Sequence, residues 1–271
     1  MATPSAAHHD EEKPRLVGMH IYVLPNLLTT LNMFWGFFAI IYSINGNFTW
    51  AAYAIVVAAI FDLLDGRVAR MTHATSKFGA EYDSLCDLVS FGLAPGILLF
   101  LWSLEPFGRV GWLASFFYVA CGALRLARFN VQSGSVEKGF FQGLPIPMAA
   151  GIVASSVLAF EDLEFDAARS WALLAMTFLL GFVMVSNFRY RSFKDLDLKH
   201  RLPFKYLVVG VFMIAVIAIR PESALFVLFL TYAILGAVFG IWRLRVHRPR
   251  FGRPYSQEPN EDLHEELDDE P

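Results

Sequence analysis

Long apolar stretches constrain this chain more than any other feature. Crossing the hydrocarbon core of a membrane takes about 20 predominantly apolar residues at a rise of about 1.5 Å each. Eight segments approach that length, and we expect helices at residues 24–44, 50–70, 83–103, 111–129, 145–163, 170–188, 204–220 and 223–243. The pattern predicts an all-α, polytopic transmembrane helical bundle of about eight helices, with six as the lower limit.

The composition excludes an ordinary soluble domain. Hydrophobic residues make up 56% of the chain and charged residues 17%, whereas soluble domains carry roughly 25% charged residues. The two cysteines, Cys86 and Cys121, fall inside expected spans, so a disulfide framework or a zinc site is not indicated.

Basic residues predict how the chain lies in the membrane. All of the 22 Lys and Arg residues except Arg109, Arg169 and Arg220 fall on one side of the expected spans. Because basic residues collect on the cytoplasmic side, both termini are expected there. We divide the chain into a disordered or amphipathic N-terminus (1–20), a transmembrane domain (21–245) and a basic, then acidic, C-terminal tail (246–271).

Four aspartates lie where a membrane span should carry no charge. Asp62 and Asp65 lie near the end of the second expected span, and Asp83 and Asp87 open the third. Residues three or four apart share a helix face, and the short link at 71–82 predicts antiparallel neighbouring helices. We therefore expect all four carboxylates to converge at the cytoplasmic boundary.

Converging carboxylates predict a metal site. Four of them would repel one another, and divalent cations relieve that repulsion most simply. Oxygen ligands suit Mg²⁺ or Mn²⁺, and four aspartates suffice for the two-metal arrangement used in phosphoryl displacement. The alternative is that single aspartates form structural hydrogen bonds or pair with Arg67 and Arg70. Beside them, Gly66 and Ala69 leave a notch that either admits a ligand or allows close helix packing.

The spacing of these residues resembles the defining motif of the CDP-alcohol phosphatidyltransferase family. All eight motif positions are present, namely Asp62, Asp65, Gly66, Ala69, Arg70, Gly79, Asp83 and Asp87. Residues 24–29 with Asn32, residues 123–130 and residues 141–147 resemble the membrane-embedded (type II) phosphatidylserine synthases within it. The resemblance covers roughly residues 20–245.

The resemblance implies an activity and its machinery. The phosphatidyl group of CDP-diacylglycerol would pass to L-serine at two divalent cations, Mg²⁺ or Mn²⁺, held by the four aspartates, with Asp87 also the general base. The positions that match CDP-lipid contacts are Asn26, Thr29, Gly66, Ala69, Arg70, Ser76 and Gly79. It also implies a homodimer among membrane lipids, in the inner membrane of a bacterium, with no nucleic-acid partner.

The acceptor pocket is the least constrained part of the site. Serine carries a carboxylate and an ammonium group, so its pocket needs a cation and hydrogen-bond acceptors. Arg125 and Arg128 share a helix face and could bind the carboxylate, with Asn130, Glu81 and Gln142 as further polar contacts. Alternatively, the two arginines are ordinary anchors that extend to lipid headgroups.

Three other functions compete with this one. A sister transferase would use glycerol 3-phosphate or inositol phosphate and would need a further basic cluster near the metals. A cation-coupled transporter would need polar residues across the whole membrane, whereas those here stop at the cytoplasmic end. A catalytically dead scaffold would not be expected to keep the complete motif.

Overall fold

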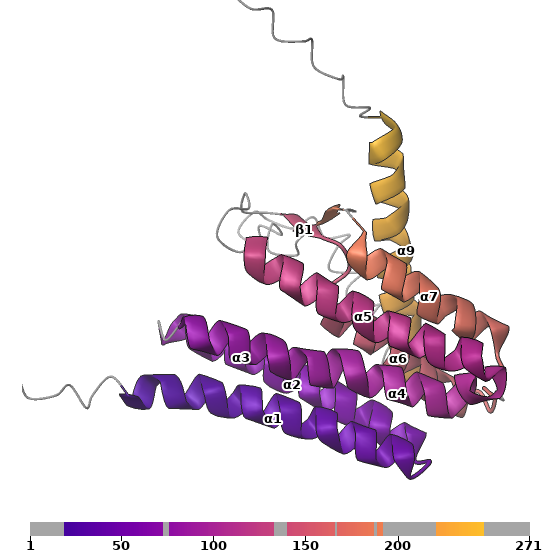
Figure 1. Ribbon diagram of the computed structural model, residues 1–271, viewed down its shortest axis with the longest axis horizontal. Coiled ribbons are helices and arrows are strands. Elements are labelled where there is room, and N and C mark those ends of the chain that lie inside the picture. The colour runs from indigo at the N-terminus through magenta and orange to yellow at the C-terminus, as the bar shows by residue number, and fades with distance from the viewer. Residues whose placement is uncertain are drawn as a thin grey trace, which may run out of the picture.

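The protein is a bundle of long helices, seen in a computed structural model (Figure 1). The structure describes residues 19–72, 76–132, 140–165, 167–186, 189–191 and 221–246. The helices in sequence order are α1 (Met19–Ile44), α2 (Phe48–Met71), α3 (Lys77–Asp87), α4 (Ala94–Leu99), α5 (Arg109–Gln132), α6 (Ile146–Asp162), α7 (Trp171–Val185) and α9 (Pro221–Val246). This confirms the predicted all-α bundle.

The third span is one continuous rod built from several helix types. Helix α3 continues through a π-helical segment, η2 (Leu88–Leu93), into α4, and then through η3 (Phe100–Leu104) and η4 (Glu105–Phe107). It begins at Lys77, six residues earlier than the expected 83, because the Ser76 hydroxyl caps the helix by accepting a bond from the Gly79 N–H at 2.9 Å. Asp83 and Asp87 therefore lie inside the helix and not at its start.

Other differences from the expected spans are small. Pro221 begins α9, a position that suits proline because the first helical N–H needs no partner. Strands β1 (Phe140–Gln142) and β2 (Arg189–Arg191) pair antiparallel and are a short exception to the helical fold. The expected span at 204–220 and both predicted terminal segments, except for residues 19–20 and 246, lie outside the described residues.

Small side chains lie inside the bundle and large apolar ones on its outside, as expected for a protein in lipid. Within the described residues, four helical stretches are long and apolar enough to cross a membrane: Val23–Ile44, Phe48–Met71, Lys77–Phe107 and Arg109–Gln132. Alanines of α2 are buried inside the bundle, while Phe34, Trp50 and Phe116 are exposed on its outside. Small residues allow close helix packing where lipid provides no hydrophobic drive between helices. The chain is therefore a membrane protein.

Helix α1 organises the part of the bundle that holds the aspartates. It packs along α2 on one side and along α3 and η2 on the other, and the three rods lie side by side (Figure 1). Helix α5 packs against η2 and α7, and α6 joins α2 to α9. The C-terminal end of α2 and the N-terminal end of α3 thus lie near the start of α1.

Candidate active site

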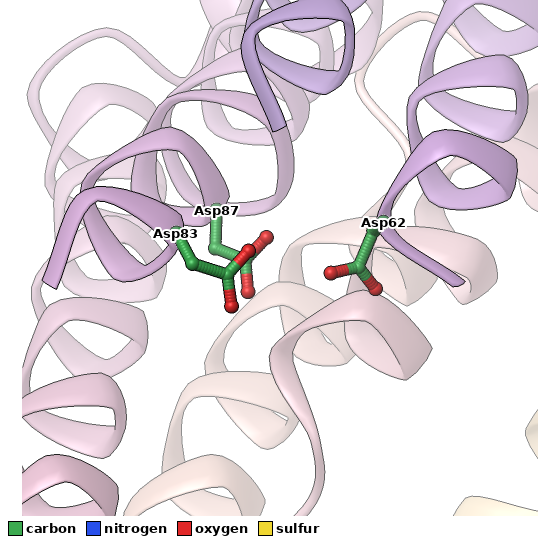
Figure 2. A group of neighbouring side chains, drawn as sticks. All are labelled: Asp62, Asp83 and Asp87. Atoms are coloured by element: carbon green, nitrogen blue, oxygen red, sulfur yellow. The ribbon is translucent and has the colours of Figure 1, made fainter. Parts of the chain in front are cut away.

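Three aspartates from two helices meet at one point. Each of Asp62, Asp83 and Asp87 offers an oxygen, and these atoms lie within 4.8 Å of one another. Figure 2 shows the Asp62 carboxylate of α2 facing those of Asp83 and Asp87 from α3. Asp87 is buried, with 8% of its surface exposed. Such a group of oxygens matches the ligands of hard divalent cations.

Asp65 lies beside this group and not within it. Side chains three residues apart on a helix point in directions about 60° apart. Asp65 therefore does not point in the same direction as Asp62. Asp65 is buried and lines a neighbouring pocket together with Asp83. Asp83 therefore belongs both to the three-carboxylate group and to the pocket.

The pocket brings together residues that are far apart in the sequence. It encloses about 140 Å³ where the start of α1, the end of α2 and the start of α3 meet. Its lining residues are Pro25, Asn26, Thr29, Asp65, Gly66, Ala69, Ser76, Gly79, Ala80 and Asp83. Every position expected to contact the CDP-lipid is among them except Arg70.

Two glycines keep the pocket open. A Cβ atom on Gly66 would lie 3.6 Å from Arg70 Nη1, so the Arg70 guanidinium lies beside Gly66. A Cβ on Gly79 would lie 3.1 Å from Ser76 Oγ and 3.5 Å from Asn26 Oδ1. Polar side chains thus border both glycines, Arg70 at Gly66 and Ser76 with Asn26 at Gly79.

The carboxylates leave hydrogen-bonding capacity unused. Asp65 Oδ2 and Asp83 Oδ1 are both buried and have no hydrogen-bond partner in the described part of the chain. Buried polar atoms without partners are rare in folded proteins, and buried charges are normally paired or bound to metals. The donor set thus fits divalent cations, and the family described below is generally dependent on them.

The two arginines expected in the acceptor pocket have different surroundings. Arg125 interacts electrostatically with Asp87 and Asp62, and its guanidinium carbon lies 5.4 Å from the centre of the Phe129 ring. Arg128 instead donates a hydrogen bond of 2.9 Å to the carbonyl oxygen of Val185, the last residue of α7. Arg125 therefore lies within electrostatic range of the carboxylate group, and Arg128 joins α5 to α7.

Two of the remaining expected acceptor residues, Asn130 and Glu81, form a polar link between α5 and α3. Asn130 donates to Glu81 Oε2 at 3.2 Å and accepts a bond of 3.2 Å from the Ser84 hydroxyl. Gln142 lies in β1, opposite Arg189 of β2. Glu81 and Ser84 lie within one helical turn of Asp83 on α3, so the link joins Asn130 to that part of the helix.

One residue at the site had no role assigned from the sequence. Asn32 of α1 is fully buried, and its Nδ2 donates to Asp87 Oδ1 at 3.1 Å. The sequence does point to Asn32, because a polar side chain inside an apolar span normally has a function or a partner. The partner could not be identified, because 55 residues separate Asn32 from Asp87.

Known proteins match this chain over most of its length. The family model described as CDP-alcohol phosphatidyltransferase matches residues 22–186. A CDP-diacylglycerol–serine O-phosphatidyltransferase of Helicobacter pylori is 39% identical over 223 residues, covering 81% of this chain and 92% of the relative. One of Mycobacterium leprae is 33% identical, covering 79% of this chain and 73% of the relative.

An archaeal relative extends the comparison. The archaetidylserine synthase of Methanothermobacter thermautotrophicus is 39% identical over 169 residues, covering 62% of this chain and 69% of the relative. The matched region contains the three-carboxylate group, the pocket and Arg125. The chain belongs to the CDP-alcohol phosphatidyltransferase family.

Proposed function

We propose that the protein transfers the phosphatidyl group of CDP-diacylglycerol to the hydroxyl of L-serine, forming phosphatidylserine and CMP. The observation that carries this proposal is the group of Asp62, Asp83 and Asp87 beside a pocket lined by family motif residues. The acceptor follows from the relatives, whose names specify serine in bacteria and archaea.

The aspartates are proposed to hold two divalent cations, Mg²⁺ or Mn²⁺. Asp62, Asp83 and Asp87 form one set of ligands, and Asp65 with Asp83 forms the second, so Asp83 is shared. The unpartnered oxygens of Asp65 and Asp83 support this assignment. Bound cations would supply positive charge against the diphosphate and the departing CMP.

The residues around the pocket are proposed to bind the cytidine diphosphate. Asn26 and Ser76 offer polar side chains in the pocket, beside Gly66 and Gly79. Arg70 lies beside Gly66, where it can pair with phosphate oxygens. The acyl chains would remain in lipid between the apolar outer faces of the helices.

Asp87 is proposed as the general base. As the serine oxygen bonds to the β-phosphorus, the Asp87 carboxylate accepts the hydroxyl proton. The bond between that phosphorus and the bridging oxygen breaks at the same time, and CMP leaves with the electron pair. The buried position of Asp87 among three carboxylates suits a group that must accept a proton.

The acceptor pocket is proposed to lie between the carboxylate group and α5. Arg125 provides the cation for the serine carboxylate, and its interaction with Asp62 and Asp87 supports this role. Asn130 and Glu81 offer polar contacts for the ammonium group, and Gln142 is included because residues 141–147 resemble the family. Arg128 would contribute by joining α5 to α7 through its bond to the Val185 carbonyl oxygen.

The cellular setting is part of the same proposal. The excess of basic residues at one side supports an orientation with both termini and the active site in the cytoplasm. We further propose a homodimer in the inner membrane of a bacterium, on the basis of the resemblance to the family.

The acceptor is tested by CMP release from the purified protein in detergent with CDP-diacylglycerol and Mn²⁺. L-serine, glycerol 3-phosphate and inositol phosphate are supplied in separate reactions. The proposal predicts release that depends on serine, with phosphatidylserine identified by mass. Release with a phosphorylated acceptor and not with serine would assign a sister transferase. Folded protein inactive with all three would contradict the transferase and favour cation transport.

A further inference from the structure

The side chain of Asn32 makes a contact that packing alone does not explain. It lies in the middle of the apolar helix α1, fully buried, and donates from Nδ2 to Asp87 Oδ1 at 3.1 Å. Its own Oδ1 is buried and has no hydrogen-bond partner in the part of the chain that the structure describes. An apolar side chain would avoid that loss, so the amide is retained for what its N–H does to Asp87.

The backbone around Asn32 is fixed against the same helix. The Ser90 hydroxyl donates to the Asn32 carbonyl oxygen at 3.0 Å, and both residues are fully buried. One turn further along α1, a Cβ on Gly36 would lie 2.2 Å from Ser90 Oγ and 2.6 Å from Ser90 Cα. The two helices can approach this closely only at a glycine, so Asn32 is held at a defined distance from Asp87.

The helix that carries Asp87 is also fixed at this point. The π-helical segment η2 begins immediately after Asp87, and π-helical turns disturb the regular backbone bonds of a helix. The buried Tyr118 hydroxyl of α5 donates to the Phe91 carbonyl oxygen at 3.1 Å within that segment. Asp87 is thus anchored from α1 through its side chain and from α5 through the following turn.

We propose that Asn32 is a positioning residue for Asp87. By donating to Oδ1, it fixes the rotation of the carboxylate and leaves Oδ2 for the cation and for the proton of the acceptor. Mutating a residue that orients a metal-binding group in this way typically lowers metal affinity or activity by about 10- to 100-fold. The inference rests on the proposed function for the role of Asp87, but the contact itself does not.

Two substitutions at Asn32 separate positioning from packing. Asn32→Ala removes the donor, and Asn32→Asp keeps the size of the side chain but places a carboxylate against Asp87. We expect Asn32→Ala to lower kcat by about 10- to 100-fold with little change in KM for either substrate. Asn32→Asp should lower kcat by at least as much. Initial rates of CMP release, measured on full-length protein with CDP-diacylglycerol, L-serine and Mn²⁺, give both parameters.

The second readout is Mn²⁺ binding, measured as free Mn²⁺ by electron paramagnetic resonance without substrates. Asn32→Ala should weaken binding by about 10-fold or more. The matched control is Ser43→Ala, which removes a buried hydroxyl bond to the Ala39 carbonyl within the same helix and away from the aspartates. It should leave kcat and Mn²⁺ affinity unchanged.

The outcomes distinguish this inference from the proposed function. If Asn32→Asp keeps more activity than Asn32→Ala, or if Asn32→Ala keeps its Mn²⁺ affinity, the side chain serves packing and the inference is overturned. If the unsubstituted protein releases no CMP with serine, the proposed function fails. In that case the Mn²⁺ measurement alone still decides the role of Asn32.

Discussion

Replacing Gly66 by alanine should stabilise the protein and impair it at the same time. Gly66 lies in the interior of α2, where glycine is less favourable than alanine by about 1 kcal/mol. The new Cβ would meet only the Arg70 guanidinium, at 3.6 to 4.0 Å, which is ordinary van der Waals contact. The fold therefore has room for the methyl group.

The bound nucleotide would not have that room. Gly66 lines the pocket, so the methyl group enters the space assigned to the CDP headgroup. Adding a methyl group to a well-packed site costs about 1 to 3 kcal/mol, which corresponds to a roughly 5- to 150-fold rise in KM for CDP-diacylglycerol. The gain in helix stability corresponds to a rise of about 2 to 4 °C in Tm.

Two assays on the same preparation test this prediction. Thermal unfolding in detergent, followed without substrate or added cation, gives Tm, and CMP release at varied CDP-diacylglycerol gives KM. A raised KM with an equal or higher Tm is expected. An unchanged KM would refute the assignment of this pocket to the nucleotide, and a clear fall in Tm would refute the argument that the fold has space at Gly66.

Three further predictions concern stability. Gly36→Ala should lower Tm sharply, because its Cβ would overlap Ser90 Cα and the two helices would have to separate; a Tm equal to that of the unsubstituted protein would contradict the close approach. Tyr118→Phe should lower the free energy of unfolding by about 1 to 3 kcal/mol, since it leaves the buried Phe91 carbonyl without its donor; a neutral effect in thermal unfolding would show that the bond is dispensable. Adding Mn²⁺ at about 100 times its dissociation constant should stabilise the protein by about 2.7 kcal/mol, reversibly on chelation; no shift in Tm would contradict a cation site.

The membrane fold could be predicted because its cause is local in the sequence. Apolar length alone predicts a spanning helix, and the spans at 24–44 and 50–70 match α1 and α2 closely. Boundaries set by single side chains could not be located in the same way. The start of α3 depends on the Ser76 cap, which overrides the apolar pattern that begins further along the chain.

The site was predictable to the extent that helix periodicity governs it. The four-residue spacing of Asp83 and Asp87 places them on one face, as the structure shows. The rotation of Asp65 away from Asp62 into the pocket depends on how α2 is turned against α1, and a spacing of three leaves that open. Contacts between distant helices, such as Asn32 with Asp87, depend on the packing of the bundle.

The most direct test of the account compares Asp87→Asn with the unsubstituted protein for both products. CMP and phosphatidylserine are quantified in the same reaction with CDP-diacylglycerol, L-serine and Mn²⁺, and CDP-diacylglycerol binding is measured separately. The account predicts one CMP for each phosphatidylserine in the unsubstituted protein. It predicts that Asp87→Asn still binds CDP-diacylglycerol but forms neither product at a comparable rate. Full activity in the folded variant would contradict the assignment of the reaction to this carboxylate group.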